Sequence, residues 1–212
     1  MTILPQVIEA HYGSAYRIEH RVAQYRRQPA RYAPNQDRSF IMSTASIREA
    51  IERVGAAISA RPESARAKNS LATARVTERL QCEVSGPNGE RITTDMPPAM
   101  GGSASGPNPG WFLRGALASC TATVIAMRAA KLGVDLSMVE VTVESESDNR
   151  GMLGLDEDVT AGLAAVRTRV RIGAPGASAD VLRDIVKWAD AHSPVICTIR
   201  QPPSCSLEIE VM

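Results

Sequence analysis

The stretch NPGWFLRGALASCTATVIAMRAAKLG, residues 108–133, is the part of the sequence from which the fold is best inferred. Asn108 and Pro109 are typical of the N-cap and the first turn of a helix, and Gly133 is typical of the residue that ends one. The residues between them are apolar on nearly every side, so other parts of the structure must cover the helix. The stretch therefore predicts a buried central helix over about 109–132.

This helix is not expected to cross a membrane. Its strongly apolar part, Gly115–Met127, has only 13 residues, lies between Arg114 and Arg128, and contains several hydroxyl side chains. A membrane span needs about 20 apolar residues. The composition therefore predicts a helix in the core of a globular protein.

The flanking residues alternate with the period of two that is typical of strands. Val76, Leu80, Cys82 and Val84 share one face of a predicted strand, and the Asn88-Gly89 turn leads to a return strand at 91–95. Residues 139–143 and 166–172 predict two more antiparallel strands, whose glutamates and arginines should pair across the ladder. A second helix follows, with Val181, Ile185 and Trp188 on one face. A final strand is predicted with Cys205, Leu207, Ile209 and Val211 on one face, which makes the fold class α+β.

The chain divides into three regions. Residues 71–212 form the predicted main domain, and residues 42–70 an amphipathic helix and a linker, with the helix beginning near the capping-box pattern Ser46–Glu49. Two interpretations of residues 1–41 stay open, a binding arm or targeting peptide, and a poorly ordered extension or residues before a native start at Met42.

Composition excludes several classes of function. The formal net charge of +1 provides no sustained basic surface, so a nucleic acid is not an expected partner. The N-terminus lacks the pattern of a secretion signal, and the four cysteines lack the spacing of a metal site. The sequence predicts a cytoplasmic protein with reduced thiols and with no metal or organic cofactor.

Cys120 is the candidate for a reactive thiol because polar residues follow it in an otherwise apolar helix. Composition alone leaves open whether it is reactive or an inert core residue. Cys82 and Cys205 fall on apolar faces of predicted strands, where a free cysteine acts as a small hydrophobic residue.

The whole segment from about residue 74 to 211 resembles the OsmC/Ohr family of organic hydroperoxide resistance proteins. The resemblance lies in the hairpin, the glycine-rich loop, the Asn108-Pro109 helix start, Cys120 in the helix and the late Pro194-Val195 turn. It implies antiparallel sheets packed around a buried central helix, and an intertwined homodimer whose active sites are shared between subunits. It also implies a thiolate at Cys120 that reduces a small apolar hydroperoxide and is regenerated by a dithiol reductant.

Three departures from the family pattern put full activity in doubt. Gly110 occupies the position of the family's glutamate, Ser193 replaces its resolving cysteine, and no arginine aligns with its hairpin arginine. If Ser193 and Pro194 open a helical turn, Cys197 lies one turn later and is the alternative resolving residue. We therefore expect thiol peroxidase activity that is weakened or altered.

The alternative hypothesis is a non-catalytic OsmC-like module that binds a small lipid-like ligand in an apolar pocket near Trp111 and His192. His192 also fits a plain surface or helix-end position. Glu78 falls on the apolar strand face, so either a buried carboxylate near the thiol or a residue at the solvent end of the strand is expected.

Overall fold

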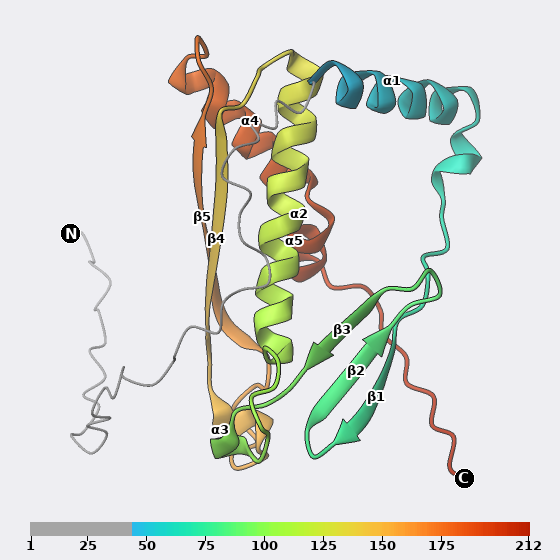
Figure 1. Ribbon diagram of the computed structural model, residues 1–212, viewed down its shortest axis with the longest axis vertical. Helices are drawn as coiled ribbons and strands as arrows, with labels where there is room; N and C mark the ends of the chain where they lie inside the picture. The colour runs from blue at the N-terminus through green and yellow to red at the C-terminus, as the bar shows by residue number, and fades with distance from the viewer. Residues whose placement is uncertain (1–43) are drawn as a thin grey trace, which may run out of the picture. The chain divides into compact units, whose positions relative to one another are not determined.

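The computed structural model describes residues 44–212, so the predicted extension 1–41 lies outside the described residues. Helices and antiparallel strands are mixed along this part of the chain, which confirms the α+β prediction (Figure 1). The elements in chain order are α1 (Thr44–Ala60), η1 (Pro62–Ala65), β1 (Thr73–Glu78), β2 (Gln81–Ser85), β3 (Arg91–Thr94), η2 (Pro98–Met100), α2 (Pro109–Leu132), β4 (Met138–Ser147), α3 (Asn149–Met152), β5 (Leu163–Gly173), α4 (Ala179–His192) and α5 (Pro194–Arg200).

The central helix α2 has the bounds that its end residues predict. The Asn108 side chain caps its N-terminus by accepting a hydrogen bond from the Trp111 backbone N–H at 2.9 Å. Gly133 ends it in the left-handed conformation, with φ of 70°, which glycine adopts without the penalty of a Cβ. The prediction of a helix over about 109–132 is confirmed.

The hydrophobic core lies where α2 meets α4 and the β4–β5 ribbon. Ile125 and Ala129 of α2 and Ile185 and Ala189 of α4 are at most 1% exposed. By length and composition, α2 is the one helix in residues 44–212 that is apolar enough to cross a membrane, a test that core helices also pass. It packs against α1, α4, α5 and β4, and its buried residues are Leu117, Thr121, Ile125, Ala129 and Ala130.

Strands β4 and β5 form the predicted antiparallel pair. Arg171 donates to Glu140 at 2.8 Å and Arg167 to Glu144 at 3.2 Å, so glutamates and arginines pair across the ladder as expected. All four side chains are at least half exposed, and such pairs contribute little free energy in water. Their effect is to favour this register over a shifted one.

The N-terminal sheet has three strands in the order β1-β2-β3. The β2–β3 hairpin is confirmed, with Gly89 at φ 88° in its turn. The prediction of one strand through residues 76–84 is wrong, because the chain reverses at Arg79, which has φ of 51°, and pairs Val76 with Cys82. Residues that alternate on both sides of a tight turn imitate one continuous strand.

The predicted final strand is also wrong. Residues 202–212 form no strand, and Leu207, Ile209 and Val211 are 83%, 78% and 88% exposed. An alternating sequence becomes a strand only where a neighbouring strand accepts and donates its backbone hydrogen bonds. Cys205 is exposed as well, so its interpretation as a core residue is wrong, whereas Cys82 is half-buried.

Helix α1 begins earlier than predicted. Its first described residue is Thr44, so Ser46 lies inside the first turn and is not the N-cap. The Thr44 hydroxyl donates to Asp135, which follows α2, and α1 packs on α2. Val54 and Ile58, in the second half of α1, are exposed.

The buried carboxylate of Asp95 holds the glycine-rich loop that leads into α2 through hydrogen bonds. Asp95 is 1% exposed, and it accepts hydrogen bonds from Met96, Ser103 and Ser105. The Ser103 hydroxyl, followed by the other donors, holds the pKa of Asp95 well below its usual range. At Gly102 there is no room for a side chain, because a Cβ would lie 1.9 Å from the Met96 carbonyl oxygen.

We expect Asp95→Asn to lower the midpoint of thermal unfolding by several degrees, because the amide NH₂ group would face backbone N–H donors. The depressed pKa means that the carboxylate stabilises the fold above its unfolded pKa of about 4, and that this stabilisation is lost as the pH falls towards the folded value. Unfolding curves at pH 7 and pH 3 should therefore differ less for Asp95→Asn than for the wild type. The exposed Asp184→Asn is the matched control, and an equal pH response of both variants would contradict the prediction.

Candidate functional site

The structure brings Cys120 and Ser193 together, although 73 positions separate them in the sequence. Cys120 lies in the middle of α2 and is half-buried. Ser193 is fully buried, and its hydroxyl donates a hydrogen bond to the Cys120 Sγ at 3.3 Å. The thiol of the central helix therefore faces the residue that precedes Pro194.

Ser193 joins two helices, which explains where its side chain points. It follows His192, the last residue of α4, and Pro194 opens α5. Its backbone carbonyl accepts from the Cys197 N–H at 3.0 Å, whereas its side chain makes no capping bond to α5. The hydroxyl is thus directed to the Cys120 sulfur, and a cysteine at this position would place a second sulfur there.

Cys197 lies one turn into α5, as the sequence predicts for a helical turn that opens at Ser193 and Pro194. Its Sγ donates to the Ala191 carbonyl oxygen at 3.4 Å. The sulfur is thus held by the end of α4. A resolving role for Cys197 stays a prediction.

The start of α2 contains an arginine that the sequence analysis did not single out. Arg114 donates from Nη1 to the Ser145 hydroxyl of β4 at 3.2 Å. A Cβ added at Gly110 would lie 3.7 Å from the same Nη1. A glutamate at position 110 would therefore have a cation beside it, and the four-residue spacing of these two positions was the available signal.

His192 ends α4, in agreement with a helix-end position. Its ring stacks on Trp188 with centroids 4.0 Å apart, and its Nδ1 lies 2.7 Å from the Trp188 carbonyl oxygen. The Arg128 guanidinium lies 4.7 Å from the Trp188 ring centroid. Such a stack stabilises the contact between α2 and α4.

The other two predicted site residues lie at the surface of the described chain. Glu78 is exposed at the end of β1, so the hypothesis of a buried carboxylate is wrong and the solvent-end position holds. Trp111 is 52% exposed at the start of α2, where its ring meets Phe112 edge to face. Neither residue contacts the thiol through a hydrogen bond in the described structure.

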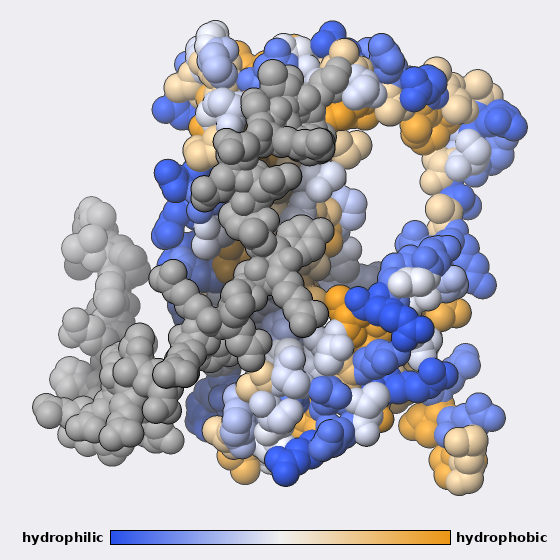
Figure 2. Space-filling view, viewed as in Figure 1, coloured by the Kyte–Doolittle hydropathy of each residue, from blue (hydrophilic) through white to orange (hydrophobic). Residues whose placement is uncertain are grey.

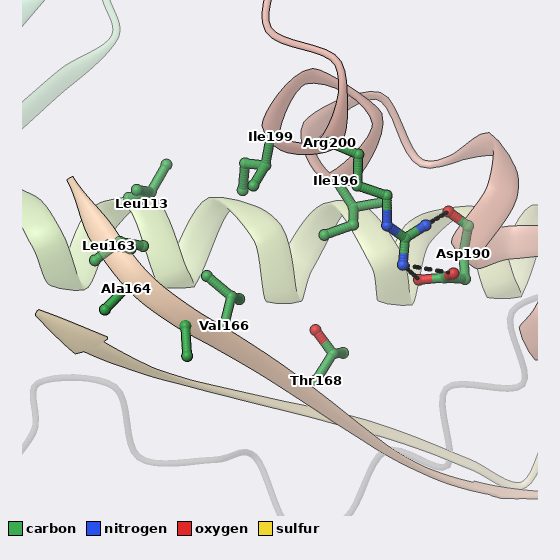
Figure 3. A pocket seen from close by; sticks show the side chains of 10 residues that line it. Leu113, Leu163, Ala164, Val166, Thr168, Asp190, Ile196, Ile199 and Arg200 are labelled. Carbon is green, nitrogen blue, oxygen red and sulfur yellow. Dashed lines mark hydrogen bonds and ion pairs between the residues drawn. The ribbon is translucent and has the colours of Figure 1, made fainter. Parts of the chain in front are cut away.

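A groove of about 610 Å³ lies between α2, β5 and α5 (Figure 3). Its walls are mainly apolar, and Leu113, Val166 and Ile196 line them. Arg200 and Asp190, which also line it, form an ion pair with 2.9 Å between Nη2 and Oδ2. The groove is lined by neither Trp111 nor His192, so its position differs from that of the predicted apolar pocket.

Comparison of the chain with models of protein families gives one matching family. The family model described as OsmC-like protein matches residues 102–208, which include most of the glycine-rich loop, α2, the β4–β5 ribbon, α4 and α5. Among curated protein sequences, none matches the chain significantly.

Two solved structures of OsmC-like proteins have the same fold, and a third protein is similar at a lower TM-score. An OsmC-like protein from Mycoplasma pneumoniae is 18% identical, with a TM-score of 0.55, over 65% of this chain and 91% of that chain. An OsmC-like protein of unknown function from Vibrio cholerae is 13% identical, with a TM-score of 0.52, over 62% and 94%. An organic hydroperoxide resistance protein, OsmC, from Legionella pneumophila is 18% identical, with a TM-score of 0.49, over 64% and 92%.

Proposed function

Because the chain belongs to the OsmC-like protein family, we propose that it reduces organic hydroperoxides through the thiolate of Cys120. The observation that carries this proposal is the contact between Cys120 and Ser193. It places a half-buried cysteine of the central helix against the position that the family resemblance assigns to a second cysteine. Two residues so far apart in sequence meet there only because α2 packs on α5.

The chemistry requires three events at this site. The Cys120 thiol loses its proton, the thiolate attacks the O–O bond of the peroxide, and the alcohol leaves while the sulfur becomes a sulfenic acid. The Ser193 hydroxyl is placed to donate a hydrogen bond to the sulfur in its anionic state.

We expect the reaction to be slower than in a protein with the complete family pattern. A cation beside a cysteine increases the thiolate fraction, which is only about 3% at pH 7 for an unassisted thiol with a pKa of ~8.5. Arg114 is held by Ser145 of β4, and Gly110 provides no carboxylate that would position an arginine. Ser193 is thus the polar partner of the thiol within the described residues.

Stopped-flow consumption of cumene hydroperoxide by the full-length protein tests the proposal. We expect consumption faster than by the same concentration of free cysteine, and labelling of Cys120 by a sulfenic-acid reagent. A rate equal to that of free cysteine together with no sulfenic acid would contradict the proposal.

A non-catalytic module that binds a small lipid-like ligand is the second candidate, and the groove favours it. Its walls would cover an acyl chain, although the Arg200–Asp190 ion pair does not suit a purely apolar ligand. A thermal shift with fatty acyl compounds, combined with no peroxide consumption, is the result expected of this candidate.

We propose that the chain acts as a homodimer in the cytoplasm. Large hydrophobic residues are exposed on the N-terminal sheet, where Val76 is 68% and Ile92 45% exposed, and on α1, where Val54 is 59% exposed. Figure 2 shows the hydropathy of one face of the molecule. A partner that covers these exposed residues would remove this apolar surface from water. Light scattering coupled to size-exclusion chromatography should give twice the mass of one chain, and a monomer mass at micromolar concentration would contradict the proposal.

A further inference from the structure

The four cysteine sulfurs of the chain have different hydrogen-bond partners. Cys197 donates to Ala191 and Cys205 to Pro203, each through a backbone carbonyl close to it in the sequence. Cys82 lies in β2, with its Sγ 4.0 Å from the Leu80 carbonyl oxygen. The Cys120 sulfur accepts a hydrogen bond from the Ser193 hydroxyl. A hydroxyl cannot reduce a sulfenic acid, and the Cys197 sulfur is hydrogen-bonded to the Ala191 carbonyl oxygen and not to Cys120, so we expect the reducing thiol to come from another molecule.

The groove is lined by residues of the same two helices, α2 and α5, that pack at the Cys120–Ser193 contact. Leu113 lies seven residues before Cys120 in α2, which places the two residues on the same helix face, two turns apart. Ile196 lines the groove less than one turn after Ser193. The side chains in Figure 3 converge on this space from α2, β5 and α5. Cys120 and Ser193 do not line the groove themselves, so the thiol arm of a bound molecule would have to extend past Ile196 towards the sulfur.

The groove offers charges of both signs at one wall. The Arg200 guanidinium and the Asp190 carboxylate are about half exposed, so both remain accessible to a ligand. A ligand that carries an ammonium and a carboxylate would pair with both groups, whereas a ligand with a single charge would leave one of them poorly matched. The α-amino-acid end of a small peptide has this pair of charges, and the volume of the groove is in the range of small-molecule sites.

We propose that a small zwitterionic peptide thiol binds in this groove and reduces the Cys120 sulfenic acid, a step that rests on the proposed peroxide reduction. The thiolate of the peptide attacks the Cys120 sulfur, an S–S bond forms, and the S–O bond breaks to release water. A second peptide thiol attacks the mixed disulfide, which returns the Cys120 thiol and leaves the oxidised peptide disulfide. In total, one hydroperoxide and two thiols give one alcohol, one disulfide and one water.

Glutathione is the probe for the test. The full-length protein is oxidised with one equivalent of cumene hydroperoxide, glutathione is added, and intact-mass and peptide mass spectrometry follow Cys120. We expect a transient mixed disulfide of one glutathione at Cys120. Arg200→Ala should raise the glutathione concentration for half-maximal formation of this adduct about tenfold, the equivalent of one lost charge pair. Arg200→Ala should leave the reaction with the uncharged 2-mercaptoethanol unchanged.

The matched control is Arg183→Ala, which removes an exposed arginine that pairs with Asp180 in α4, outside this groove. An internal or intersubunit disulfide at Cys120, or reduction by dihydrolipoamide but not by glutathione, would overturn the peptide-thiol proposal and leave the proposed function intact. Equal effects of Arg200→Ala on glutathione and 2-mercaptoethanol would also overturn it. The absence of any sulfenic acid at Cys120 after oxidation is the separate sign that the proposed function itself fails.

Discussion

Ser193→Cys is expected to convert the site into one that closes a disulfide with Cys120 after a single oxidation. The serine Oγ lies 3.3 Å from the Cys120 Sγ, and the new sulfur would occupy nearly the same place. A disulfide bond is about 2.05 Å long, so the two sulfurs need to approach by roughly 1 Å. We expect peptide mapping without reductant to show a 120–193 disulfide in the variant and none in the wild type.

The same disulfide should stabilise the oxidised variant strongly. It would close a loop of 73 residues, for which the chain-entropy model gives roughly 4 kcal/mol. Denaturant unfolding of the oxidised and reduced variant measures this difference. Ser193→Ala is the control, because it removes the hydrogen bond to the sulfur without adding a thiol. A variant that forms a sulfenic acid at Cys120 but no 120–193 disulfide would show that the two side chains do not meet in solution.

The central helix and the β4–β5 ribbon were predictable because local residues determine them. Asn108, Pro109 and Gly133 are typical residues of helix ends and bound α2. The residues of β4 alternate along the strand, and Glu140 and Glu144 pair with arginines of β5. The reversal at Arg79 was not predictable, since no glycine, proline or asparagine stands at that turn. The C-terminal residues 202–212 alternate like a strand, but a strand also needs a neighbour, which no local pattern provides.

The candidate site was predictable only in part. Cys120 was singled out from the polar residues that follow it, but Ser193 was singled out only through the family resemblance, since no local rule links residues on two separate helices. The groove, with Arg200 and Asp190 at its wall, combines residues from four elements and has no sequence signature. Arg200 was not considered because its partner Asp190 lies in a different helix, ten residues earlier. Residues that meet through tertiary packing have to be found in the structure.

Cys120→Ser is expected to reduce the rate of hydroperoxide consumption at least about 100-fold, to the level of the uncatalysed reaction. The proposed reaction needs a sulfur that loses a proton near neutral pH and gives up two electrons to the peroxide. A serine hydroxyl meets neither requirement. Because a serine is close in size to cysteine and Cys120 is half-buried, the fold should survive, which circular dichroism and thermal unfolding can verify.

Cys82→Ser is the matched control for this variant. Cys82 is also half-buried, but it lies in β2 with its sulfur directed to the Leu80 carbonyl oxygen, away from the Cys120–Ser193 contact within its own chain. Its rate should stay within about twofold of the wild type, since the substitution touches no group that reacts in the proposed scheme. A folded Cys120→Ser protein that consumes cumene hydroperoxide as fast as Cys82→Ser would contradict the proposal, because the reaction would then not depend on the Cys120 sulfur.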